Sequence, residues 1–166
     1  MRHFLIGLAA CVVVSPLAAQ AVPAWVTADT ALKTVTLDLR AERSADGLHT
    51  LNGEREGSIQ IIVPQRWTVR WTWCNADSLE KRSLIVMQER EKLPEQAGSP
   101  AFTNAVTRSP VAGLAFGMKD VSEFEADEGG WYWILGGVPT HAIGGEYIGL
   151  RVDPAAAGVS VKRKSS

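Results

Sequence analysis

Alternating apolar and polar residues predict β-strands along most of the chain. Residues 33–42 (KTVTLDLRAE) and 66–75 (RWTVRWTWCN) each place apolar side chains on one face and mainly polar side chains on the other, which is the period of two of a half-buried strand. Residues 130–136 (GWYWILG) are apolar on both faces, as in a strand that is buried inside a sandwich. Further candidate strands cover residues 58–64, 82–89, 121–127 and 145–153.

Turn residues separate these segments. Residues 51–57 (LNGEREG) have the composition of a turn. A longer connection, residues 92–118, is rich in Pro, Gly, Ser and Ala and shows no sustained helical period, so we expect a structured excursion with one helical turn at most. Seven or eight short strands with regular turns around one core predict an all-β protein, an antiparallel β-sandwich.

The first 21 residues predict a signal peptide rather than a part of the fold. A weakly basic start is followed by an apolar stretch from Phe4 to Val14, a Ser-Pro break and AQA just before Val22, which fits cleavage after residue 21. The apolar stretch is far shorter than the ~20 residues of a membrane-spanning helix. Lipoprotein processing at Cys11 is the alternative, because LAAC resembles a lipobox. Both routes predict export, to the periplasm or the cell exterior.

The remaining residues, 22–166, have the size of one domain and should bury a core without cross-links. We expect that core to span about residues 33–153. The formal net charge of the chain is −1, which implies neither nucleic acid nor an acidic surface as a partner. Once the signal peptide is removed, Cys74 is the single cysteine, so no internal disulfide can form.

The sequence contains no group of residues that is typical of an enzyme. It lacks a Gly-x-Ser-x-Gly nucleophile motif, a Cys/His pair at useful spacing and a phosphate-binding glycine loop. We therefore expect no catalytic residues.

Tryptophans are frequent and could form a sugar-binding platform. Trp67, Trp71 and Trp73 instead share one strand face, and Trp131 and Trp133 lie in the strand that is apolar on both faces. Each ring buries a large apolar area when it packs inside a protein. The pattern therefore predicts core packing for all five.

Three stretches of the chain resemble a known family. They are residues 51–75 (LNGEREGSIQIIVPQRWTVRWTWCN), 99–117 (SPAFTNAVTRSPVAGLAFG) and 124–152 (FEADEGGWYWILGGVPTHAIGGEYIGLRV). Together they are similar to the sulfocyanins, members of the cupredoxin family of blue copper proteins. The resemblance implies a cupredoxin-like Greek-key β-sandwich with the long excursion before the last strands. It also implies a type 1 copper centre, which uses two histidines, a cysteine thiolate and a weak axial ligand, usually methionine.

Three of the four positions that match the family's copper ligands hold another residue type. The first histidine position falls on Arg82, the cysteine position on Gly136 and the methionine position on Glu146, whereas the second histidine is kept as His141. Glycine offers no thiolate, and arginine is a permanent cation. We therefore expect no copper at a type 1 site. We also hypothesise an ion pair between Arg82 and Glu146 in its place.

Other candidate metal ligands carry weaker signals. His141 alone is typical of a hydrogen-bonded structural histidine, although with Glu146 it could hold zinc or Cu(II) weakly. Cys74 ends a strand and is interpreted as an inert thiol. The remaining soft or borderline ligands are scattered without a ligand spacing, and they are Met87, Met118 and His49.

A cupredoxin without its redox ion cannot carry electrons, so the resemblance implies another role. Cupredoxins commonly dock to partners through the apolar surface around the ligand loop, which this chain keeps at Val138, Pro139, Ala142 and Ile143. We expect a binding or accessory module for a protein partner, such as a membrane complex at the outer face of the cytoplasmic membrane. The alternative is a copper-handling or electron-transfer protein with an unconventional site that uses His141, Glu146 and either Cys74 or a methionine.

Overall fold

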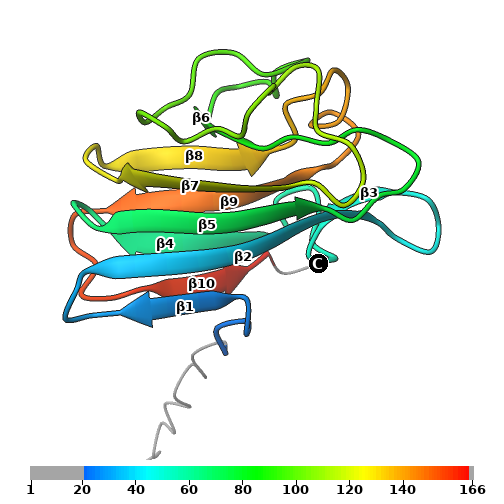
Figure 1. Cartoon of the computed structure of the whole chain (residues 1–166). Coiled ribbons are helices and arrows are strands. Elements are labelled where there is room, and N and C mark those ends of the chain that lie inside the picture. Colours follow the sequence, from blue (N-terminus) through cyan, green and yellow to red (C-terminus); the bar gives the residue numbers. More distant parts are fainter. Residues whose placement is uncertain (1–20, 165–166) are drawn as a thin grey trace, which may run out of the picture.

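Two β-sheets pack face to face in the computed structural model, which describes residues 21–164 (Figure 1). The expected signal peptide, with Cys11, lies outside the described residues except for its last position. The first sheet has the order β1–β2–β5–β7 with β3 paired to β2, and the second has the order β10–β4–β9–β8–β6. The strands are β1 (Val26–Asp29), β2 (Thr34–Arg43), β3 (His49–Leu51), β4 (Ile59–Pro64), β5 (Thr68–Asn75), β6 (Ile85–Gln88), β7 (Lys119–Glu125), β8 (Gly130–Leu135), β9 (Tyr147–Asp153) and β10 (Ser160–Arg163).

Both sheets are mixed. Strand β2 runs parallel to β5, with Leu37 opposite Trp71, and β4 runs parallel to β9, with Ile61 opposite Leu150. The other pairings between the described strands are antiparallel. The predicted all-β sandwich is confirmed, but an antiparallel arrangement is wrong at these two pairings. The described residues form ten strands rather than seven or eight, because β1, β3 and β10 have only three or four residues each and are too short to show a period.

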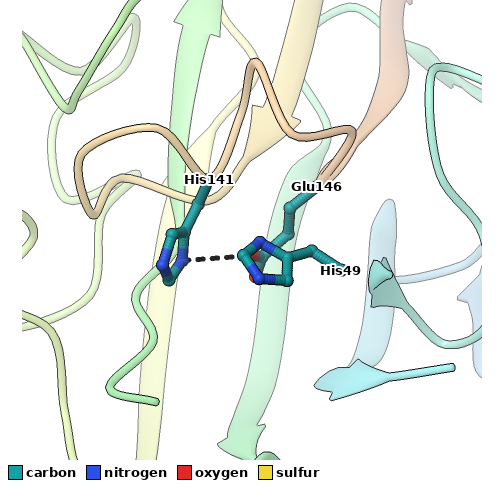
Figure 2. Close-up of side chains that lie close together, drawn as sticks. All are labelled: His49, His141 and Glu146. Atoms are coloured by element: carbon teal, nitrogen blue, oxygen red, sulfur yellow. Dashed lines mark ion pairs between the residues drawn. The ribbon is translucent and has the colours of Figure 1, made fainter. Parts of the chain in front are cut away.

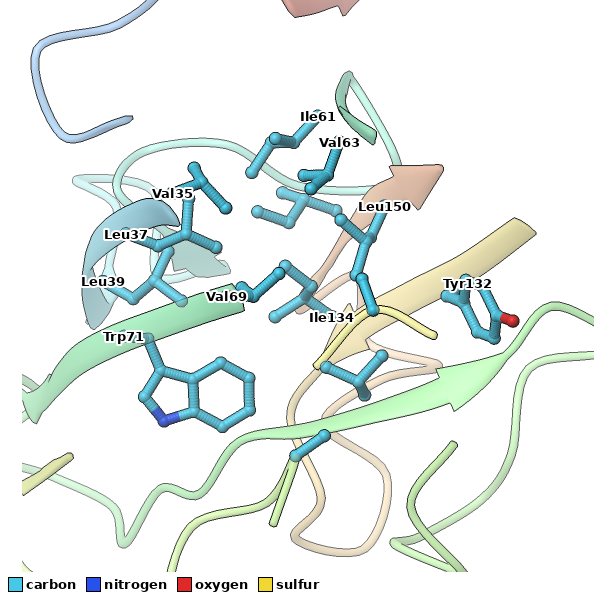
Figure 3. Close-up of a cluster of buried hydrophobic side chains, with 14 of the residues drawn as sticks. Val35, Leu37, Leu39, Ile61, Val63, Val69, Trp71, Tyr132, Ile134 and Leu150 are labelled. Atoms are coloured by element: carbon cyan, nitrogen blue, oxygen red, sulfur yellow. The ribbon is translucent and has the colours of Figure 1, made fainter. Parts of the chain in front are cut away.

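The core lies between the two sheets and is built from the predicted apolar faces (Figure 3). Val35, Leu37 and Leu39 of β2 are fully buried, as is Trp71 of β5, whose ring meets that of Phe124 edge to face at 5.6 Å between centroids. Full burial of a large apolar side chain stabilises the fold by about 1.5–3 kcal/mol. The core also reaches beyond the expected range of 33–153, because β1 and β10 contribute buried valines.

The tryptophan prediction is confirmed except at one position. Trp67, Trp71 and Trp73 lie in the main core, and Trp133 belongs to a second buried cluster. Trp131 is 49% exposed, with the guanidinium carbon of Arg151 at 4.8 Å from its ring centroid. Trp131 and Trp133 are two residues apart and therefore share the outer face of the second sheet. The residues that bury Trp133 on this face leave Trp131 half exposed.

The long excursion between β6 and β7 covers part of that outer face. Its backbone is tied to β6 and the segment before it, through hydrogen bonds from Val86 N to Ala105 O and from Thr107 N to Leu84 O, each 2.8 Å long. Over residues 92–118 the described backbone forms turns and isolated bridges but no helix. One bridge joins Arg82 to Leu114 through two hydrogen bonds, so the excursion fixes the backbone of a predicted site residue. No helix in the described part of the chain is long and apolar enough to cross a membrane.

Candidate metal centre

The predicted site residues meet at one end of the sandwich. His141 and Glu146 come from the connection between β8 and β9, and Arg82 comes from the connection between β5 and β6. Strand β3 adds His49, whose ring lies beside the ring of His141 and close to the Glu146 side chain (Figure 2). Asp77, two residues after the end of β5, is buried against Arg82. The packing of the two sheets brings these connections together, so charged groups that are remote in sequence become neighbours.

Arg82 is fully buried and its guanidinium is occupied by two carboxylates. Its Nε and Nη2 atoms both donate to Oδ2 of Asp77, and its Nη1 atom donates to Oε2 of Glu146 at 2.5 Å. The ion pair expected between Arg82 and Glu146 is therefore present, with a single hydrogen bond. Asp77, which was not anticipated, accepts two hydrogen bonds from Arg82 instead.

Asp77 responds electrostatically to this position. Burial alone would raise the pKa of its carboxyl, but hydrogen bonds from Arg82 and the Leu79 amide, together with the charges of Arg82 and Arg43, lower that pKa to about 2. The carboxylate is therefore ionised at neutral pH and compensates the buried guanidinium. Arg43 continues the network to the surface, with its Nη2 atom 3.2 Å from Asp77 and 2.9 Å from Glu80.

The two histidines link the buried carboxylate to an exposed one. Nδ1 of His141 lies 3.2 Å from Oε2 of Glu146, and Nδ1 of His49 lies 4.0 Å from the same oxygen. On the other side of the rings, Oε2 of Glu80 is 3.2 Å from Nε2 of His141 and 3.3 Å from Nε2 of His49. Burial, followed by the charges of Arg82 and His141, lowers the pKa of His49, so this ring is neutral at neutral pH.

Two buried atoms of the histidines and Glu146 have no hydrogen-bond partner. They are Oε1 of Glu146 and Nδ1 of His49. One ligand atom from each of His49, His141 and Glu146 can be chosen so that all three lie within 4.8 Å of one another. These are donor types that bind divalent cations. Sequence reasoning treated His49 as scattered, because it is far from His141 in the chain and only the pairing of β3 with β2 brings it to the site.

The donor set does not fit a type 1 copper centre. Gly136, at the cysteine position, hydrogen-bonds through its backbone N to Glu146 O at 2.9 Å. A Cβ atom on Gly136 would lie 2.8 Å from the Glu146 carboxyl and 3.0 Å from Cβ of His141. The glutamate carboxyl therefore occupies the space into which a cysteine side chain would project. Arg82, which the sequence aligns with the first histidine position, is a buried, hydrogen-bonded cation, so the aligned residues supply neither a thiolate nor a second imidazole.

The other candidate ligands are elsewhere. Cys74 is half-buried in β5, opposite Arg40 and Lys119, and it is not part of the histidine–glutamate group. Met87 packs against the second buried cluster, and Met118 is exposed.

The apolar surface expected around the ligand loop is only partly available. Ile143 is 56% exposed, Pro139 is exposed and Val138 is half-buried. Ala142 is fully buried in the second cluster, so its assignment to a contact surface is wrong. Its side chain instead packs the loop against the second buried cluster.

Neighbouring connections add exposed apolar side chains at the same end of the sandwich. Leu79 and Phe116 are exposed, and they belong to two loops that Asn75 joins. The Asn75 side-chain amide donates to Glu80 O and to Leu114 O, each at 2.9 Å. Ile143, Leu79 and Phe116 therefore mark an apolar rim on the loops around the buried ionic cluster.

A second concave region lies away from this cluster. It is a groove of about 600 Å³ on the outer face of the second sheet, with Trp131, Trp133 and Tyr147 among its lining residues. None of its lining residues belongs to the histidine–glutamate group. Burial, followed by the charges of Glu56 and Glu89, raises the pKa of Tyr147, so its hydroxyl is protonated at neutral pH.

Comparison with known proteins gives one family and several similar folds. A family model described as the sulfocyanin (SoxE) domain matches residues 23–159. Reduced auracyanin from Roseiflexus castenholzii has 19% identity and a TM-score of 0.51, over 72% of this chain and 97% of auracyanin. Copper nitrite reductase from Nitrosomonas europaea has 23% identity and a TM-score of 0.51, over 75% of this chain and 43% of the reductase. At such identities the solved structures show the fold alone. A search of curated proteins found no match.

Proposed function

The chain belongs to the sulfocyanin family of cupredoxins, and on this premise we propose that it is an exported binding or accessory module that has lost the family's type 1 copper centre. The observation that carries the proposal is a buried ion-pair network at positions that the sequence aligns with metal-binding groups. Arg82 bonds to Asp77 and Glu146 where an imidazole would bind copper. Function depends on the site rather than on the scaffold, so the cupredoxin fold alone does not make this chain an electron carrier.

Energetics support the loss of the copper centre. A type 1 ion would have to bind beside a guanidinium that is fully buried and already paired. Removal of one partner from a buried pair leaves an uncompensated charge and costs about 3–5 kcal/mol. Copper would also lack a thiolate, since Gly136 has no side chain and Cys74 lies outside the group. The Arg82 guanidinium therefore opposes copper at the type 1 position both by its charge and by its occupancy of the space.

The apolar rim supports a role in binding. Ile143, Leu79 and Phe116 are exposed around a site that no longer serves a redox reaction. Large exposed apolar side chains that gather on one surface mark interaction sites. The proposed partner is a protein, with a complex at the outer face of the cytoplasmic membrane as the preferred type. The module works there as a free exported domain, or as a lipoprotein anchored at Cys11.

Copper handling at an unconventional site is the second candidate function. The grouping of His141 and Glu146 with His49 favours it, because two imidazoles and a carboxylate can bind Cu(II). Cys74 and the methionines do not support it, since they lie outside this group.

A metal titration with a visible spectrum tests the proposal. The purified protein would be incubated with Cu(II) and then with Cu(I), desalted, and analysed for bound copper and colour. We expect no intense blue band. An intense blue band would overturn the proposal. Stoichiometric, weakly coloured copper that is lost in the His141→Ala variant would establish the second candidate, because imidazole and carboxylate ligands give no intense thiolate band.

A further inference from the structure

We propose that His49, His141 and Glu146 form a binding site for a redox-inactive divalent cation, with Zn²⁺ as the fitting ion. The site goes beyond the proposed function, because zinc would not restore electron transfer and partner binding does not require it. It also differs from the copper centre implied by the family, since His49 comes from β3 and neither a thiolate nor the Arg82 position takes part.

The three side chains are already close to a coordinating geometry. One ligand atom from each can be chosen so that all three lie within 4.8 Å of one another. Tetrahedral zinc with bonds near 2.0–2.2 Å needs ligand atoms roughly 3.4 Å apart. The Glu146 carboxylate is close to both rings, since its Oε2 atom, which Arg82 holds, lies 3.2 Å from Nδ1 of His141 and 4.0 Å from Nδ1 of His49. Coordination through the unpaired Oε1 atom then requires rotation of the carboxylate and of the His49 ring.

Unsatisfied buried atoms give an independent reason for a ligand. Glu146 is fully buried, and its Oε1 atom has no hydrogen-bond partner, while Arg82 occupies Oε2. His49 Nδ1 is likewise buried without a partner. Buried polar atoms in folded proteins are nearly always satisfied. A cation between these groups would satisfy both atoms at once.

Glu80 orients the two histidines for this role. Its Oε2 atom lies 3.2 Å from Nε2 of His141 and 3.3 Å from Nε2 of His49. A carboxylate there accepts an Nε2–H from each ring, which leaves both Nδ1 atoms on the Glu146 side. Nδ1 of His49 has no partner, and Nδ1 of His141 lies 3.5 Å from Nη1 of Arg82. Metal-binding histidines commonly carry such a carboxylate on the far nitrogen. Glu80 is therefore a positioning residue rather than a ligand in this proposal.

Charge balance favours a cation despite the arginine. Two guanidiniums, those of Arg43 and Arg82, face three carboxylates, those of Asp77, Glu80 and Glu146. These five groups together carry one surplus negative charge. Arg82 donates to Asp77 and to Oε2 of Glu146, and its Nη1 atom also lies 3.5 Å from Nδ1 of His141. Oε1 remains open on the same carboxylate, and a bound cation would replace the contact between Arg82 and His141. Two imidazoles and one carboxylate are a known ligand set for zinc, with the fourth position open to water.

Zinc titration of the purified, chelator-treated protein tests the site. Isothermal calorimetry with Zn²⁺ should give a stoichiometry near one. His49→Gln and His141→Gln each remove a ligand and should weaken binding by more than the roughly 10–100-fold that loss of an outer partner costs. Glu80→Gln should stay within that smaller range. Glu123→Gln, on the exposed face of β7, is the control and should bind zinc like the parent protein.

Thermal unfolding of each variant in chelator separates loss of a ligand from loss of the fold. A His49→Gln variant that unfolds like the parent protein but binds zinc weakly supports the site. The proposal is overturned if the parent protein shows no saturable zinc binding, or if a folded His49→Gln variant binds as tightly as the parent. Neither result affects the proposed binding module. That proposal would be contradicted by a blue copper spectrum, or by unchanged partner binding after substitution of the exposed apolar rim residues.

Discussion

Nη1 of Arg82 lies 2.5 Å from Oε2 of Glu146, and both side chains are fully buried. The sequence aligns these two positions with a histidine and the methionine of the family's copper site. In the structure a pair of opposite charges joins the two connections that carry them. Asp77 completes the pair by accepting two further hydrogen bonds from Arg82. This arrangement decides what the site can bind and also how stable the loop end of the sandwich is.

Removal of the buried guanidinium should strongly destabilise the fold. Arg82→Leu leaves the carboxylate of Glu146 buried without its cation, and we expect a loss of about 3–5 kcal/mol in the free energy of unfolding. Urea titration measures this loss. Arg82→Leu combined with Glu146→Leu removes both charges and should recover part of it. Arg108→Ala, which breaks an exposed pair with Asp120, is the control and should cost less than about 1 kcal/mol. A loss that small at Arg82 would contradict a structural role for the pair.

Acid should weaken the network through Asp77. Its pKa falls from 3.8 to about 2 on folding, so its contribution is fully present above the unfolded pKa and disappears as the pH drops through the folded value. The shift corresponds to about 2 kcal/mol, lost between about pH 5 and pH 1. Urea unfolding over this range measures the slope. Asp77→Asn removes the titrating group, so a slope that persists unchanged in this variant would assign the effect to other carboxyls.

Restoration of the missing ligands should restore colour only when Arg82 and Glu146 are also replaced. Gly136→Cys alone places Cβ 2.8 Å from the Glu146 carboxyl, and we expect a cost of about 1–3 kcal/mol from overpacking and no blue band. The triple variant Arg82→His, Gly136→Cys, Glu146→Met supplies all four ligand types together with His141. Visible absorption after copper addition measures the outcome. Blue colour in the Gly136→Cys single variant would show that the ion pair does not exclude copper.

Partner contact should depend on the exposed rim. Ile143→Asp places a charge on a side chain that is 56% exposed, so it should weaken capture of the partner without lowering thermal stability. Leu32→Asp is a matched control, because Leu32 is 74% exposed in the turn between β1 and β2. This turn precedes the start of β2, whereas β3, which carries His49, pairs with the end of β2. Affinity capture with each variant, compared by mass spectrometry, measures the difference. Equal capture by all three proteins would remove the rim from the binding surface.

Two tryptophans should differ sharply in their contribution to stability. Trp71 is fully buried between the sheets, whereas Trp131 is 49% exposed. Trp71→Ala should lower the free energy of unfolding by about 3–5 kcal/mol because it leaves a cavity. Trp131→Ala loses mainly its contact with Arg151, worth about 0.5–1 kcal/mol at an exposed site. Urea unfolding of both variants provides the comparison, and similar losses would contradict the arrangement of the second sheet.

Much of the fold could be predicted from residue pattern. The period-two alternation in β2 and β5 identified the faces that carry Leu37 and Trp71 into the core, because one buried face imposes that alternation. Sheet order leaves no such local signal. The parallel pairing of β2 with β5 follows from packing of distant segments, and β1, β3 and β10 have too few residues to alternate visibly.

The site was only half predictable for a related reason. Arg82, Gly136, His141 and Glu146 could be aligned with a family motif, and the ion pair followed from their charges. His49 and Asp77 belong to no motif. They reach the site because β3 pairs with the end of β2 and because the chain turns after β5, and such proximity is determined by the tertiary fold rather than by spacing. Trp131 was misassigned because the apolar sequence of a strand does not show which of its residues other segments bury.

The Arg82 network also has a consequence for how the protein matures. When a metal joins the loops of a protein, that part of the structure is complete only after the ion has been delivered, and its stability follows the metal supply and the protonation of the ligands. Here the cation that joins the two connections is a side chain of the polypeptide itself. Closure of this end therefore accompanies folding directly and needs no copper-loading step. Copper scarcity would therefore leave this end of the sandwich folded.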